Sequence, residues 1–176
     1  MSEGTSSLSL TWTLDSEAAL VARAAQAARQ WVECDASWLL VGLVGELGAG
    51  KTTWVRGMLR ELGYEGRVPS PTYTLLEQYD VEDLTVLHLD LYRLPDPVPD
   101  GSERAEELEA LGIRDWFGRD GTWLLVEWPD RSATLAARCD VVLAIQCPGV
   151  AQQRTVTLTA QTGAGEVALR GLDAAS

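Results

Sequence analysis

A glycine-rich stretch carries the single lysine of the chain. Residues 45–54 read GELGAGKTTW, and the other thirteen cationic side chains are arginines. Glycines let the backbone turn tightly, so that successive amides point inward at an anion, and the N-terminus of a following helix adds partial positive charge. In such a phosphate loop, Lys51 reaches the β- and γ-phosphates and Thr52 offers its hydroxyl to magnesium. A turn that only caps a helix is the alternative, but the sole lysine, between a buried strand and a helix, favours the phosphate loop.

Two carboxylates close apolar strand-like segments elsewhere in the chain. Asp90 ends VLHLD and Glu127 ends WLLVE. A phosphate loop needs a carboxylate at the end of a nearby strand to hold the magnesium shell or to position water. Each acid could instead face solvent at a strand end. We expect both in the site, and the sequence leaves open which contacts the metal and which orients the attacking water.

Two further side chains next to these acids have open roles. His88 is the only histidine and lies on the same strand face as Asp90, two residues away. It could relay a proton, although a hydrogen-bonded interior imidazole is the favoured interpretation. Trp128 follows Glu127 and could stack on a base or line the pocket, whereas a core tryptophan is the commoner use.

A proline-rich segment, VPSPTYTL, precedes the first of these strands. Pro69 and Pro71 restrict the backbone and would present Ser70, Thr72 and Thr74 on a stiff turn. These hydroxyls could sense the γ-phosphate as a switch loop does, or the segment could be an ordinary turn.

The elements around these residues alternate between strand and helix patterns. Helices are predicted at residues 15–33, 52–63, 103–117 and 131–139, a loop at 95–102, and strands at 38–45, 74–81, 84–94, 121–128, 141–147 and 154–160. This order predicts an α/β domain with a mainly parallel sheet and antiparallel edges at 74–93 and 140–160. Residues 1–9 and 163–176 are predicted to be loosely held ends.

Size, cysteine usage and charge limit the class of protein. The 176 residues are 46% hydrophobic, which suits one domain, and no apolar run reaches the roughly 18 residues of a membrane span. Cys34, Cys139 and Cys147 form no C-x-x-C pair, which suits free thiols in the cytoplasm.

The net charge of -12 is concentrated in residues 76–130, which hold fifteen carboxylates and four arginines. Such a surface should repel RNA and DNA. This acidic surface either keeps the domain soluble or docks on a basic protein partner.

Taken together, the motifs resemble a known family. GELGAGKTT, WVRGMLRELG, VPSPTYTLLEQY, LHLDLYRL, LEALGIRDWF and LVEWPDR are similar in order and spacing to the bacterial tRNA threonylcarbamoyladenosine biosynthesis ATPases, the TsaE (YjeE) family, over about residues 10–160. The resemblance implies a three-layer P-loop NTPase domain that binds ATP with Mg²⁺ and hydrolyses it slowly, mainly within a complex. The implied partners are a transferase subunit, which modifies the adenosine beside the tRNA anticodon, and its paralogue. On charge, direct tRNA binding is not expected.

The resemblance also implies roles for individual residues. Thr52, Glu127 and Asp90 would attend the metal, with Lys51, Asp90 and Glu127 as the catalytic set, and Ser70, Thr72 and Tyr73 would fall in a switch-like segment. Ser16 would lie by the adenine, and Trp128 would line the nucleotide pocket. The expected phosphate-binding residues are Gly45, Glu46, Leu47, Gly48, Ala49, Gly50, Lys51, Thr52 and Thr53. Glu46 stands where the family often has aspartate, and the loop at 95–104 is longer than expected.

Three rival functions share the loop. A guanine-specific switch needs the lysine of an N-K-x-D motif, and the only lysine is already in the loop. A small-molecule kinase would need an arginine-rich lid, whereas the candidate arginines are dispersed at 93, 104, 114, 119 and 131. A binding module without turnover is the third, and hydrolysis measured with and without partners separates these classes.

Overall fold

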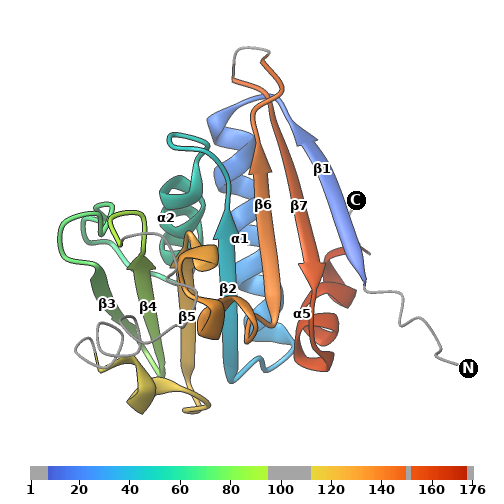
Figure 1. The fold of residues 1–176 in the computed structure, drawn as a ribbon. Coiled ribbons are helices and arrows are strands. Elements are labelled where there is room, and N and C mark those ends of the chain that lie inside the picture. Colours follow the sequence, from blue (N-terminus) through green and yellow to red (C-terminus); the bar gives the residue numbers. More distant parts are fainter. Residues whose placement is uncertain (1–7, 95–111, 150–151, 174–176) are drawn as a thin grey trace, which may run out of the picture.

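A mixed sheet runs through the part of the chain that the computed structural model describes, residues 8–94, 112–149 and 152–173. Its order is β1-β7-β6-β2-β5-β4-β3 (Figure 1). The strands are β1 (Ser9–Leu14), β2 (Trp38–Val44), β3 (Leu76–Val81), β4 (Leu84–Asp90), β5 (Thr122–Glu127), β6 (Val141–Gln146) and β7 (Arg154–Ala160). Strands β4, β5, β2 and β6 are parallel neighbours, while β3 and β7 pair antiparallel at the two sides. The predicted parallel centre with antiparallel edges is therefore confirmed.

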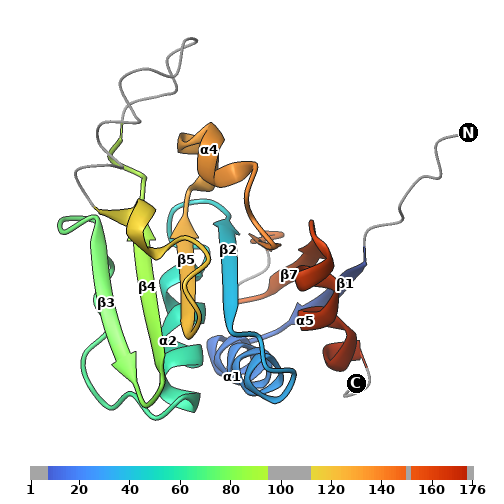
Figure 2. The same cartoon turned by 90° about the horizontal axis from the view of Figure 1, so that it is seen from below.

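Helices lie on both faces of the sheet (Figure 2). The helices α1 (Glu17–Glu33) and α2 (Lys51–Glu61) cover one face, and η1 (Ile113–Trp116), η2 (Pro129–Arg131) and α4 (Ala133–Ala136) lie on the other. Small side chains let α1 and α2 approach closely, because a Cβ on Gly57 would lie 2.9 Å from the Cβ of Ala24. The helices hold the loop that follows β2 against the sheet.

The central strands are buried on both faces. In β2, Leu39, Val41 and Leu43 pack toward α1 and α2, whereas Leu40 belongs to the cluster beneath η1 and α4. A strand covered on both sides needs apolar residues at consecutive positions. This explains the continuous run WLLVGLV, and it confirms the predicted strand.

One element begins at the border of the predicted loose end 1–9, and another lies within the predicted loose end 163–176, whereas residues 1–7 and 174–176 fall outside the described residues. Strand β1 pairs antiparallel with β7, and α5 (Gly163–Asp173) packs against β7 and α1. In α5, Ala168, Leu169 and Leu172 are buried. Gly165 lies so close to the carbonyl of Asp140 that a Cβ would overlap it. The prediction for 163–173 is therefore wrong, because packing overrides the low helix propensity of glycine.

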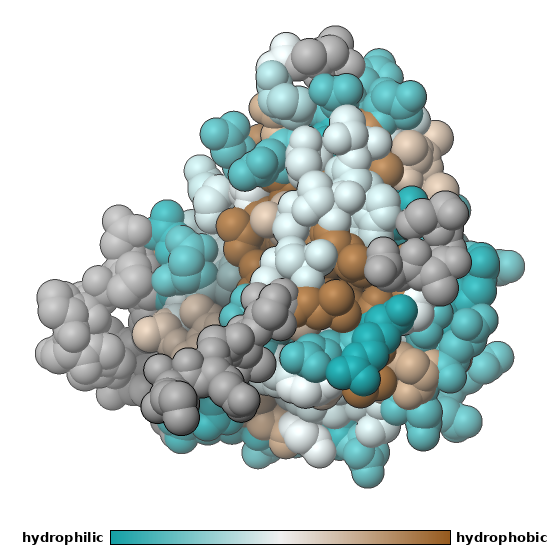
Figure 3. All heavy atoms as spheres, turned by 90° about the vertical axis from the view of Figure 1, so that its right-hand side faces the viewer, coloured by the Kyte–Doolittle hydropathy of each residue, from teal (hydrophilic) through white to brown (hydrophobic). Residues whose placement is uncertain are grey.

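The face of β1 and β7 turned away from α1 carries hydroxyl side chains. Ser9 lies 3.1 Å from Thr159 and Thr11 lies 3.0 Å from Thr157, oxygen to oxygen. Figure 3 views this edge, where weakly polar residues adjoin apolar ones. Cross-strand hydroxyl pairs satisfy one another and stabilise the edge.

Two predicted elements fall wholly or partly in residues 95–111, which the structure does not describe. The predicted loop at 95–102 and residues 103–111 of the predicted helix 103–117 lie outside the described residues. At the end of that segment, Ile113–Trp116 forms the short η1 rather than a continued α-helix. None of the described helices has both the length and the apolar character needed to cross a membrane.

We expect Leu169→Ala to lower the free energy of unfolding by about 2–4 kcal/mol, because it leaves a cavity at a fully buried position. Val167→Ala on the same helix is the matched control, since Val167 is 49% exposed. Urea denaturation measures both variants. Equal midpoints for the two would show that α5 contributes little to stability.

Candidate phosphate-binding site

The glycine-rich loop connects the end of β2 to the start of α2 at Lys51. Gly45, Gly48 and Gly50 all have positive φ angles, of 154°, 78° and 118°. A Cβ on Gly45 would lie 2.6 Å from the carbonyl oxygen of Ile145 at the end of β6. Only glycine therefore lets the loop pass this close to the neighbouring strand. The result is a tight backbone turn ahead of a helix N-terminus.

Lys51 lies beneath the loop and is almost fully buried, with 4% of its surface exposed. Its Nζ donates hydrogen bonds to the carbonyls of Gly45, at 2.9 Å, and Glu46, at 3.0 Å. It also lies 4.3 Å from the centre of the Trp128 ring. Burial lowers the pKa of the Lys51 ammonium, and the charges of Glu127 and Asp90 oppose this effect in part. A cation held in this way attracts an anion to the loop.

Glu127, at the end of β5, contacts one side chain of α2 and one of β4. Its Oε1 accepts a hydrogen bond from the Thr52 hydroxyl at 2.7 Å and lies 2.9 Å from Nε2 of His88. Burial alone would raise the pKa of Glu127, but the hydrogen bond and charge of His88, then Thr52 and Lys51, together lower it. The carboxylate is therefore held in its charged form.

His88 is fully buried and contacts Glu127 through Nε2 only. Its Nδ1 has no hydrogen-bond partner within the described residues. A carboxylate can only accept a hydrogen bond, so the contact with Glu127 requires a proton on Nε2 of His88. His88 is thus a buried imidazole that is hydrogen-bonded to Glu127, in line with the interpretation that the sequence favoured.

Asp90, at the end of β4, binds the proline-rich segment. Its Oδ2 accepts from the Thr72 hydroxyl at 2.9 Å and more weakly from Ser70 at 3.5 Å, and its Oδ1 accepts from the backbone N–H of Tyr92 at 2.9 Å. The Cα atoms of Asp90 and Glu127 are paired across the parallel strands. The two acids therefore sit side by side but hold different segments.

The remaining residues of the predicted switch-like segment point elsewhere. Thr74 is exposed, and Tyr73 is 84% exposed with the guanidinium of Arg93 lying 4.3 Å from its ring centre. Ser70 and Thr72 are therefore the hydroxyls that reach the acid.

Trp128 adopts a left-handed backbone conformation, with a φ of 59°, where the chain turns from β5 into η2. Its ring contacts both the Lys51 ammonium and the Tyr92 ring, whose centre is 5.2 Å away. It also lines a hollow of about 450 Å³ together with Gly45 and Glu46. The structure thus favours the pocket-lining interpretation of this tryptophan.

A second hollow, of about 220 Å³, lies on the other side of the loop. It is lined by Glu17, Leu20, Gly48, Ala49, Gly50, Thr53, Gln152 and Arg154. Ser16 does not line it, because its hydroxyl caps α1 by accepting from the N–H of Ala19 at 3.1 Å. Arg154 donates from Nε to the carbonyl of Ala49 at 2.9 Å. Sequence reasoning missed Arg154, since nothing in the strand RTVTLTA connects it to the loop.

The structure brings most of the predicted site residues to one edge of the sheet. Lys51, Thr52, Asp90, Glu127 and Trp128 surround the loop where the parallel strands end. Glu46 and Leu47 are exposed, so they offer the loop mainly their backbone. Within the described ranges, no three His, Cys, Asp or Glu side chains form a cluster that could hold a metal alone.

The sequence of the chain matches a family of known proteins. The family model "Threonylcarbamoyl adenosine biosynthesis protein TsaE" matches residues 14–156. The tRNA threonylcarbamoyladenosine biosynthesis protein TsaE of Haemophilus influenzae is 43% identical over 128 residues, 73% of this chain and 74% of that protein. The protein of the same name from Bacillus subtilis is 40% identical over 86 residues, 49% of this chain and about half (48%) of its own length.

A solved structure shows the same fold. The crystal structure of Bacillus subtilis YdiB aligns with a TM-score of 0.72 at 23% identity, covering 98% of this chain and 99% of that one. Given the match over residues 14–156, the chain belongs to the threonylcarbamoyl adenosine biosynthesis protein TsaE family.

Proposed function

We propose that this protein is a P-loop ATPase that binds ATP with Mg²⁺ at the loop of residues 45–53 and hydrolyses it in support of tRNA threonylcarbamoyladenosine biosynthesis. The observation that carries the proposal is the meeting of a glycine cradle, a buried lysine and two strand-end carboxylates at one edge of the sheet. Phosphoryl-transfer sites in P-loop proteins need these parts in this arrangement.

The residues present fit the nucleotide and its metal. A Cβ at Gly45 would clash with the carbonyl of Ile145 and one at Gly50 with Leu20, so glycine at both positions permits the tight turn that can direct backbone amides at an anion. A hydroxyl and carboxylates are the ligands that Mg²⁺ prefers, and it commonly completes its shell with phosphate oxygens and water. When bound, the ion supplies charge neutralisation at the phosphates.

The hydrogen bonds suggest a division of labour between the acids. Thr52 and Glu127 are joined at 2.7 Å, so this pair would attend the metal. Asp90 holds Ser70 and Thr72, so it would couple the phosphate end of the nucleotide to the proline-rich segment and orient water there. Lys51 binds the β- and γ-phosphates, and Trp128 shields it from solvent.

Membership of the family places the chain in tRNA threonylcarbamoyladenosine biosynthesis, and we propose that it contributes to this modification through partner proteins. A transferase subunit and its paralogue would carry out the transfer of the threonylcarbamoyl group. The net charge of -12 argues that these proteins, rather than this one, hold the tRNA. The free cysteines agree with the cytoplasmic location that we expect.

Hydrolysis measured alone and with the purified partners tests this function. We expect slow release of phosphate by the protein alone and acceleration by the partners. Efficient phosphorylation of a small acceptor, with no acceleration by partners, would favour a kinase. Tight binding without turnover under either condition would favour a binding module.

His88 provides a further prediction about the site. We expect His88→Leu to lower kcat for ATP hydrolysis by about tenfold with little change in KM, because Glu127 loses the donor that orients it. His88→Gln retains an N–H donor at a similar distance and should recover part of the loss. If kcat fell equally in both variants, the orienting role of His88 would be wrong.

A further inference from the structure

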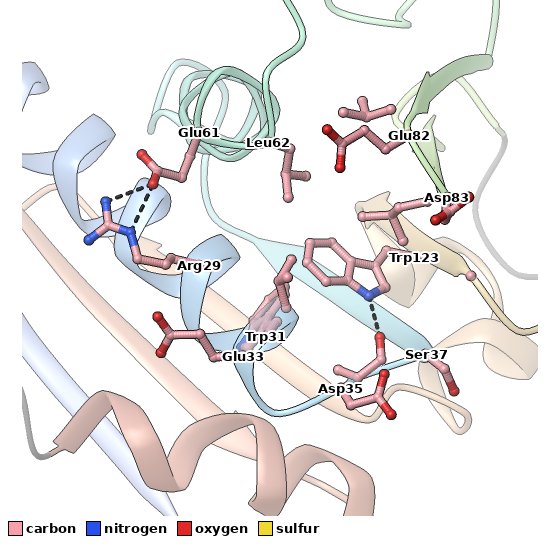
Figure 4. A pocket seen from close by; sticks show the side chains of 15 residues that line it. Arg29, Trp31, Glu33, Asp35, Ser37, Glu61, Leu62, Glu82, Asp83 and Trp123 are labelled. Atoms are coloured by element: carbon pink, nitrogen blue, oxygen red, sulfur yellow. Dashed lines mark hydrogen bonds and ion pairs between the residues drawn. The ribbon is translucent and has the colours of Figure 1, made fainter.

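A hollow of about 660 Å³ lies at the end of the sheet opposite the phosphate loop. The parallel strands β2, β4 and β5 begin near it and end at the loop. Three segments enclose it, namely the C-terminal end of α1, the C-terminal end of α2 and the turn between β3 and β4 (Figure 4). Its volume is in the range of ligand sites, and it shares no lining residue with the phosphate loop.

The floor of the hollow is apolar and firmly held. Trp123 and Trp31 meet edge to face with ring centres 5.4 Å apart, and the Trp123 indole N–H donates to the carbonyl of Ala36 at 2.7 Å. Leu62 and Leu84 are only partly buried, and Val32 is 55% exposed. A partner that covers these side chains would gain from removing them from water.

The rim of the hollow is acidic. Glu33, Asp35, Glu82 and Asp83 surround the floor (Figure 4), and none of them forms an ion pair with another described residue. Glu61 is the exception, because Arg29 contacts it at 2.7 Å. Four carboxylates around one apolar floor thus form no ion pair with the residues that the structure describes, and Arg29, which lines the same hollow, is engaged with Glu61.

The helix ends add to this negative field. The C-terminus of a helix carries partial negative charge, which basic residues in the last turn usually offset. The last turn of α1 has no basic residue and ends instead in Glu33. The C-terminus of α2 also adjoins the hollow, through Glu61 and Leu62, and Arg60 in its last turn offsets part of its partial charge. The chain therefore leaves a cation-attracting site beside an apolar surface.

We propose that this hollow docks a basic segment of a partner protein, with an apolar or aromatic side chain against Val32, Leu62 and Leu84, which the buried tryptophans support from beneath, and flanking arginines or lysines on the acidic rim. Charge complementarity argues against a phosphate-bearing occupant such as RNA. A small polyamine would satisfy the rim but leave Val32, Leu62 and Leu84 in contact with water. Because the hollow is remote from the loop, docking there leaves the nucleotide site open.

Fluorescence anisotropy with labelled peptides tests the proposal. The probes are Arg-Leu-Arg-Trp-Arg, the uncharged Gln-Leu-Gln-Trp-Gln and the non-aromatic Arg-Ser-Arg-Ser-Arg. We expect the first to bind the full-length protein most tightly and to weaken as salt rises from about 50 to 300 mM. Lys51→Ala protein should bind it as the wild type does, which separates this proposal from the ATP site.

Variants locate the binding surface. We expect Glu82→Lys with Asp83→Lys to weaken binding of the first peptide at least about tenfold, and Val32→Ser about threefold. The control, Asp15→Lys with Asp115→Lys, makes the same change in net charge at exposed positions outside the hollow and should have little effect.

Several results would overturn the proposal. They are no binding of the first peptide, equal binding of the uncharged peptide, or an equal loss in the control variant. Displacement of the peptide by spermidine at similar concentration would also contradict it, because a small polycation would then be the better occupant.

Discussion

Lys51→Ala should weaken ATP binding about 100-fold, equivalent to roughly 2.7 kcal/mol. Lys51 is the only lysine and lies under the loop, where its ammonium contacts the carbonyls of Gly45 and Glu46. Removing it takes away the charge that would face the β- and γ-phosphates in a buried setting. Isothermal titration calorimetry with ATP and Mg²⁺ measures the effect.

Two comparisons make this result specific. Arg60→Ala removes an exposed cation from the same helix and should leave ATP affinity unchanged. Lys51→Arg should also bind poorly, because the broad guanidinium does not fit between the loop carbonyls and the Trp128 ring. Wild-type affinity in Lys51→Ala would contradict the assignment of this residue.

Glu127→Ala and Asp90→Ala should each reduce turnover at least about tenfold while leaving nucleotide binding largely intact. Glu127 orients Thr52, and Asp90 orients Ser70 and Thr72, so each change misplaces groups needed in the transition state rather than in binding. Single-turnover hydrolysis and calorimetry separate the two effects.

The two acids should differ from each other in their metal dependence. Because Glu127 is bonded to Thr52, Glu127→Ala should raise the Mg²⁺ concentration needed for half-maximal turnover more than Asp90→Ala does. Asp115→Ala, at an exposed site, is the control for loss of a carboxylate. Wild-type rates in both acid variants would refute the two-acid site.

The centre of the fold could be predicted because its signals are local and strong. The apolar run of β2, the glycines after it and the amphipathic α2 each indicate their own structure. Once those strands are parallel, their carboxyl ends must meet at one edge, so Asp90 and Glu127 could be expected to lie together. The two acids are far apart in sequence, and the pairing of β4 with β5 is what brings them together.

The ends of the chain could not be predicted in the same way. Strand β1 alternates hydroxyl and apolar residues, but its partner β7 lies some 150 positions later, with Ser9 opposite Thr159. Helix α5 contains Gly163, Gly165 and Gly171, which disfavour a helix unless tight packing requires them. Long-range packing decided both elements.

Within the candidate site, the sequence indicates which residues to expect there but not how their side chains contact one another. The sequence left open which acid lies near Thr52, and the side-chain geometry joins Thr52 to Glu127. The left-handed turn at Trp128 has no sequence signature in a tryptophan. The bond from Arg154 to the loop depends on how β7 is placed beside it.

A crystal structure with a non-hydrolysable ATP analogue and Mg²⁺ tests the central claim most directly. The account predicts that the β- and γ-phosphates lie against the amides of residues 45–53, with Nζ of Lys51 within hydrogen-bonding distance. A nucleotide bound elsewhere on the protein, with the loop empty, would contradict it.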